Sequence, residues 1–194
     1  MKFDLKKMYS FLLSHTFPGL LLMVEISLFL RSIGSDVFHL LIKINNPVIV
    51  VLAGYAFSTL LGTILDGMQH FIFDTIDWIA NKNINHKINT KKKFEAFKKS
   101  GDKCVKIYDR FLSDDLWYPY EALANISIAM LLGLLLLWGK LGLPLWFWSL
   151  CLIISIILFW TAKRTYYFFW DEEEQFIEVY SREDNTIPQK DGNV

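Results

Sequence analysis

The sequence lacks the short motifs that identify many enzyme and binding classes. It contains no Walker motif, no glycine-rich dinucleotide fingerprint, no HExxH, no CxxC and no G-x-S-x-G. Nothing therefore supports the nucleotide-binding, zinc-protease or serine-hydrolase classes that these motifs mark. Cysteine is scarce as well. Cys104 lies in a basic segment and Cys151 within an apolar run, which argues against a disulfide framework.

The formal net charge is zero, because 20 lysines and arginines balance 20 acidic residues. The two signs are nevertheless separated along the chain. Residues 81–115 hold ten bases against five acids, whereas residues 171–194 hold eight acids against two bases. The chain therefore has a basic segment and an acidic tail, which are able to pair with each other or with partners.

Apolar residues, by contrast, are abundant and make up 53% of the chain. Runs long enough to cross a bilayer begin near residue 11 or 18, at 47, at 118 and at 144. We predict an all-α membrane protein, a bundle of four transmembrane helices with cytoplasmic helical extensions. Its parts are an N-terminal interfacial segment with the first two helices (1–80), a basic helical segment (81–115), the last two helices (116–170) and an acidic tail (171–194).

Lysine and arginine counts predict the orientation of these helices. The basic residues concentrate in the N-terminus, in residues 81–115 and in the tail, which places both termini in the cytoplasm by the positive-inside rule. The first apolar run follows several lysines, as in a signal peptide. No small-residue cleavage site follows it, and Glu25 interrupts it. We therefore expect an uncleaved first span in an integral, multi-pass membrane protein.

The second apolar run, residues 47–80, carries a special residue at every fourth position, which keeps these residues near one face of a helix. The row consists of Gly54, Ser58, Gly62, Asp66, His70 and Asp74. Its small residues, Gly54 to Gly62, predict a close contact with another helix, either within the chain or between subunits. Four spans make a thin bundle, so this contact favours a homo-oligomer.

The ionisable half of the row predicts a candidate site. Asp66 and His70 fall where the second span leaves the bilayer, and the topology brings His15, Glu121 and Asn125 to the same level. His15, Asp66, His70 and Glu121 are metal-ligand types, so a divalent metal ion or an acid–base centre with His70 and Glu121 as catalytic candidates is one interpretation. The plainer interpretation, which the sequence alone favours, is a set of interfacial residues that bind one another and water.

Glu25 is the acid expected deepest in the membrane. It lies fourteen residues after Phe11, or about 21 Å along a helix, and a carboxylate at that depth normally faces a bundle interior or a water-filled path. Glu25, Asp66 and His70 are therefore candidates for a pore or proton path. If the first span instead begins at Pro18 and tilts, Glu25 faces an interface.

The basic segment contains the lysines most suited to lipid or partner binding. Anionic headgroups or a cytoplasmic protein are the expected partners, and nucleic acid is unlikely by comparison. Pairing with the acidic tail is the simpler alternative. The residues concerned are Lys91, Lys92, Lys93, Lys98 and Lys99.

Three functional hypotheses follow. The leading one is a homo-oligomeric, channel-like or membrane-effector protein with ionisable residues near the cytoplasmic leaflet. The second is an intramembrane metal-dependent enzyme that uses His15, Asp66, His70 and Glu121. The third is a membrane anchor subunit that docks a soluble partner. No cofactor other than a divalent metal ion is suggested, and the sequence leans away from an enzyme.

Overall fold

The structure, a computed structural model, describes residues 5–34, 46–79, 98, 106, 108 and 116–182. These residues are helical apart from short turns and form no strand. Four helices are long and apolar enough to cross a membrane, which confirms the predicted all-α multi-pass membrane fold. The side of the membrane on which each end lies stays a prediction.

The first span is one long helix with an irregular turn. Helix α1 (Leu5–Phe11) continues through a π-helical turn, η1 (Leu12–Thr16), into α2 (Phe17–Ser32). Gly34, at φ 76°, follows the helix in the left-handed conformation that glycine adopts without strain.

The second span is helix α4 (Pro47–Ile79), which begins immediately after a capping residue. The Asn46 side chain accepts hydrogen bonds from the backbone N–H groups of Val48 and Ile49, at 3.0 and 3.4 Å, as an N-cap does. From Pro47 to Phe57 every residue is exposed or half-buried. In a membrane protein this apolar half is suited to contact with lipid or with another subunit.

The last two spans form an antiparallel pair. Helix α6 (Tyr118–Leu137) and helix α7 (Leu145–Arg182) are joined by a short turn in which Gly139 and Gly142 have φ of 71° and 62°. Helix α7 has 38 residues, about 57 Å at 1.5 Å per residue, which is nearly twice the hydrocarbon thickness of a bilayer. The helix is therefore longer than one crossing of the hydrocarbon core requires.

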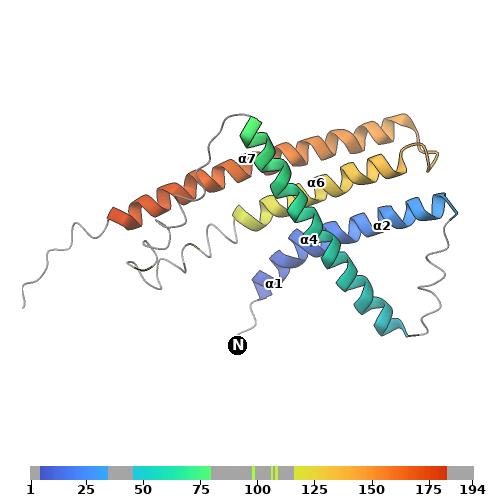
Figure 1. The fold of residues 1–194 in the computed structure, drawn as a ribbon, viewed down its shortest axis with the longest axis horizontal. Coiled ribbons are helices and arrows are strands. Elements are labelled where there is room, and N and C mark those ends of the chain that lie inside the picture. Colours follow the sequence, from blue (N-terminus) through green and yellow to red (C-terminus); the bar gives the residue numbers. More distant parts are fainter. Residues whose placement is uncertain are drawn as a thin grey trace, which may run out of the picture.

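Helix α6 forms the centre of the bundle. Figure 1 shows α2, α6 and α7 side by side, with α4 running across them. In the most apolar stretch of α6, 61% of the residues are buried, whereas the corresponding share in the other three spans is 17–22%. Small buried residues allow its neighbours to approach closely; they are Ala122, Ala124, Ser127, Ala129 and Gly133. The polar residues that α6 carries are therefore placed inside the bundle.

The crossing of α2 and α4 depends on small residues. A Cβ atom added at Gly19 would overlap the Ser58 carbonyl, and one added at Gly62 would overlap the His15 carbonyl. Ser58 and Gly62 of the predicted packing row thus make the close helix contact. Gly54 does not, because a Cβ atom there would meet nothing within 4 Å in the described chain.

A buried hydrogen bond ties α6 to α7. Ser127 Oγ donates to the Ser155 carbonyl at 2.8 Å. We expect Ser127→Ala to lower the free energy of unfolding by about 1 kcal/mol, because the carbonyl loses its buried donor. Ser149→Ala, which removes an exposed hydroxyl bound to Leu145 in its own helix, is the matched control and should change stability less. Equal effects in detergent unfolding curves would contradict this expectation.

Candidate metal centre

Pro18 explains the irregular turn that positions His15. Proline has no N–H to give to the carbonyl four residues earlier, and its ring crowds that carbonyl. The carbonyl in question belongs to Ser14, which lies in the π-helical turn Leu12–Thr16. The Ser14 carbonyl accepts a hydrogen bond from Asn125 Nδ2 of α6 at 2.9 Å instead. Such π turns are frequent at functional sites.

The same turn orients the His15 ring. Ser14 Oγ lies 2.6 Å from His15 Nδ1, and the Phe11 ring stacks on the imidazole at a centroid distance of 4.8 Å. With Nδ1 occupied by the hydroxyl, Nε2 is the nitrogen available to a ligand. This is the arrangement by which a neighbouring polar group typically fixes a metal-binding histidine.

Three ligand-type residues from three helices converge beside this turn. One ligand atom each of His15, Asp66 and Glu121 lies within 4.8 Å of the other two. Glu121 is only 5% exposed, whereas His15 and Asp66 are half-buried. A divalent ion bound by one imidazole and two carboxylates requires such a grouping.

Two buried oxygen atoms without hydrogen-bond partners lie at or near Asp66 and Glu121 in the sequence. In the described part of the protein, they are Asp66 Oδ1 and Asn125 Oδ1. Each belongs to, or lies within four residues of, Asp66 or Glu121. Buried polar atoms are normally satisfied, and oxygen acceptors in excess are what a cation satisfies.

His70 and Asp74 contribute less to this centre. His70 Nε2 lies 3.8 Å from Asp66 Oδ2, and its side chain is 39% exposed. It also stacks on Trp117, with centroids 6.1 Å apart, so it flanks the group at its more accessible edge. Asp74 is exposed. Of the predicted metal set, the structure thus gathers three residues and leaves His70 beside them.

Glu25 lies apart from these residues. It is ten positions beyond His15 in the same continuous helix, about 15 Å away, and its carboxylate faces Gly133 of α6. Its Oε2 atom is buried without a partner among the described residues. The predicted path through Glu25, Asp66 and His70 therefore does not form one cluster.

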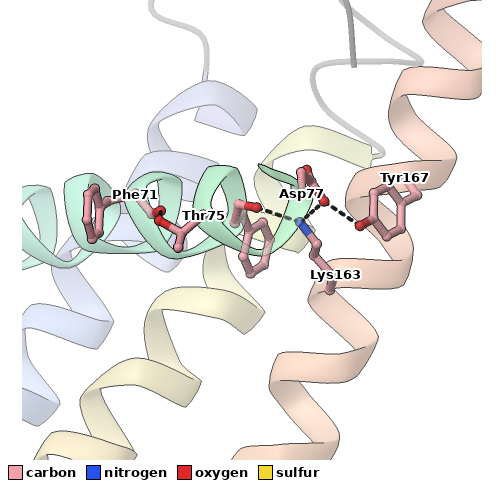
Figure 2. Close-up of polar contacts among 6 residues, drawn as sticks. Phe71, Thr75, Asp77, Lys163 and Tyr167 are labelled. Carbon is pink, nitrogen blue, oxygen red and sulfur yellow. Dashed lines mark hydrogen bonds and ion pairs between the residues drawn. The ribbon is translucent and has the colours of Figure 1, made fainter. Parts of the chain in front are cut away.

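A second polar centre fastens the end of α4 to α7. Lys163 Nζ lies 2.8 Å from Asp77 Oδ1 and donates to the Phe73 carbonyl at 3.1 Å. Tyr167 Oη donates to the same Asp77 oxygen, and Figure 2 shows Lys163 and Tyr167 both directed at this carboxylate. The Phe73, Tyr166 and Tyr167 rings lie 4.5–4.8 Å from Nζ, so cation–π attraction adds to the ion pair.

The sequence contains little that predicts this second centre. Asp77 falls outside the four-residue row of α4, and Lys163 resembles an ordinary basic residue at the end of a span. The one available signal is that both lie among aromatic residues, such as Phe73 and Tyr166. The lysines proposed for lipid or partner binding lie outside the described residues, except Lys98, which is helical and exposed.

No protein-family model matches this chain, and neither a curated protein nor a solved structure matches it. Its function is therefore inferred from its own residues.

Proposed function

We propose that this membrane protein binds one divalent metal ion between His15, Asp66 and Glu121, and that the ion activates a water molecule for hydrolysis. The convergence of three ligand atoms from three helices within 4.8 Å carries the proposal. Three protein ligands leave a coordination position for water, as in catalytic metal sites. In such a hydrolysis the water oxygen would bond to the electrophilic atom of the substrate, the bond from that atom to the leaving group would break, and a proton from the water would pass to the leaving group. His70, beside Asp66, is suited to move that proton.

Charge balance favours an ion over simple hydrogen bonding. Two charged carboxylates whose oxygens lie within 4.8 Å of each other repel by about 3 kcal/mol or more at an effective dielectric constant of 20. Among the residues whose burial is described, no buried lysine or arginine other than Lys163 is present. Lys163 is paired with Asp77 and so does not neutralise these two carboxylates. A metal ion would neutralise Asp66 and Glu121 and also bind the unpaired Asp66 Oδ1. A shared proton is the competing explanation, and metal binding separates the two.

Metal ions should stabilise the chelator-treated protein. At 100 times the dissociation constant, binding adds about 2.7 kcal/mol to the free energy of unfolding, which raises the melting temperature by roughly 5–10 °C for a chain of this size. Mn²⁺, Zn²⁺ and Mg²⁺ are added one at a time to protein in detergent, and the bound metal is measured by elemental analysis. Binding of one ion per chain is expected.

Glu121→Gln should abolish this stabilisation, because it removes a buried charged ligand. Asp74→Asn is the matched control, since Asp74 is an exposed carboxylate two turns from Asp66, and it should respond to metal as the original protein does. The proposal fails if none of the ions changes the melting temperature and none is retained.

A second candidate function, the predicted channel-like or effector activity, draws on Glu25. Its partly unpaired carboxylate against Gly133 is a feature that intramembrane ion or proton paths share. We expect Glu25→Gln to reduce proton flux into liposomes that contain the protein. Flux equal to that of empty liposomes before any substitution would rule this activity out.

A further inference from the structure

Asn125 is a buried polar residue that the three-ligand site does not use. Its side chain is fully buried on α6, one helical turn after Glu121, so both residues face the same side of the helix. Nδ2 donates to the Ser14 carbonyl at 2.9 Å, next to His15. Asn125 is thus one helical turn from the ligand Glu121 and is hydrogen-bonded to Ser14, the residue that precedes the ligand His15.

The orientation of the Asn125 amide is determined by its partner. A carbonyl oxygen only accepts hydrogen bonds, so the NH₂ group and not the amide oxygen must face Ser14. The Ser14 carbonyl is available because Pro18 has no N–H to offer it. Oδ1 is therefore turned away from Ser14, and in the described chain this buried atom has no hydrogen-bond donor.

We propose that Asn125 Oδ1 is a fourth ligand of the ion, and that this third oxygen donor narrows the affinity advantage that Zn²⁺ ordinarily has over Mn²⁺. The inference rests on the proposed metal site and adds to it. Carboxylate and carbonyl oxygens suit Mn²⁺ and Mg²⁺, whereas imidazole suits Fe²⁺ and Zn²⁺. Three oxygen donors with one imidazole fit an ion that accepts both. Structural zinc sites instead collect mainly cysteine and histidine.

Two substitutions separate a ligand role from a role in holding the π-helical turn. Asn125→Leu removes both the donor to Ser14 and the oxygen ligand. Asn125→Asp keeps the shape, loses the donor and keeps an oxygen that is a stronger ligand. If Asn125 is a ligand, the Mn²⁺ dissociation constant should rise about tenfold or more in the Leu variant and should stay equal or fall in the Asp variant. If Asn125 only holds Ser14, both variants should bind Mn²⁺ more weakly.

Mn²⁺ binding is measured by electron paramagnetic resonance, with Zn²⁺ as competitor, on full-length protein in detergent. Zn²⁺ is expected to bind more tightly than Mn²⁺ in each variant, and its advantage over Mn²⁺ should be larger in Asn125→Leu than in the original protein. Ser127→Ala, a buried change on the same helix that faces α7, is the control and should keep the original ratio of the two affinities. Circular dichroism and gel filtration confirm that each variant is folded.

The outcomes distinguish the two proposals. If the original protein binds neither Mn²⁺ nor Zn²⁺, the proposed metal site itself is wrong. If it binds metal but Asn125→Leu keeps the same affinity and metal preference, the fourth-ligand inference is overturned. Weaker Mn²⁺ binding in both Asn125 variants overturns it as well.

Discussion

Lys163→Met is expected to lower the free energy of unfolding by about 3–5 kcal/mol. Removal of one partner from a buried ion pair leaves the other charge without compensation. Lys163 and Asp77 are each 7% exposed, and the Lys163 ammonium also binds the Phe73 carbonyl. The substitution thus leaves a buried carboxylate and removes the Lys163–Asp77 ion pair from the contact between α4 and α7. Unfolding in detergent, followed by circular dichroism, measures the effect.

The double variant Lys163→Met with Asp77→Asn tests the mechanism. An asparagine carries no charge, and its carbonyl still accepts the Tyr167 hydroxyl, so most of the lost stability should return. Arg164→Met is the control because Arg164 is exposed and adjacent; its effect should stay within about 0.5 kcal/mol. A Lys163→Met protein as stable as Arg164→Met would show that the ion pair does not hold α4.

Gly62→Ala should be the second severe substitution, with a cost of about 3 kcal/mol or more. The added methyl group would overlap backbone atoms of His15, and backbone cannot move aside as a flexible side chain does. The continuous helix formed by η1 and α2 would have to separate from α4, and the cost lies at the upper end of the range for overpacked sites. Because His15 lies in η1 and Asp66 on α4, metal affinity should fall together with stability.

Gly54→Ala is the matched control on the same helix. Nothing lies within 4 Å of the position a Cβ atom would take, so this change should be neutral or stabilising by up to about 1 kcal/mol through helix propensity. Thermal melting and metal titration of both variants in detergent provide the comparison. Similar losses in the two would mean that Gly54 packs against something in the native assembly, such as another subunit.

The candidate site was only partly predictable. Topology alone groups His15, Asp66 and Glu121, because the ends of three spans on one side of a membrane must be level. Residues at the same depth in the membrane need not be close to one another, because their depth does not set the direction in which each side chain points. His70 shares the level and the helix face of Asp66, yet it lies at the edge of the group and stacks on Trp117.

The roles of Pro18 and Asn125 show why local patterns were insufficient. Pro18 is compatible with the first turn of a helix, and as such it predicts nothing about function. Its effect appears only when an amide from α6 takes the Ser14 carbonyl that Pro18 leaves free. That interaction joins residues 111 positions apart in sequence, and no periodicity within one helix encodes it.

The sequence by itself determined four membrane helices, their approximate limits and the presence of Ser58 and Gly62 on a packing face of α4, because apolar length and spacing act locally along each helix. Only the tertiary structure decided that Glu25 is separate from Asp66, that Gly54 lies outside the crossing, and that Lys163 pairs with Asp77. These outcomes depend on the angle and rotation at which helices pack. Those are set by side-chain fit between distant segments, as where α4 crosses its neighbours (Figure 1).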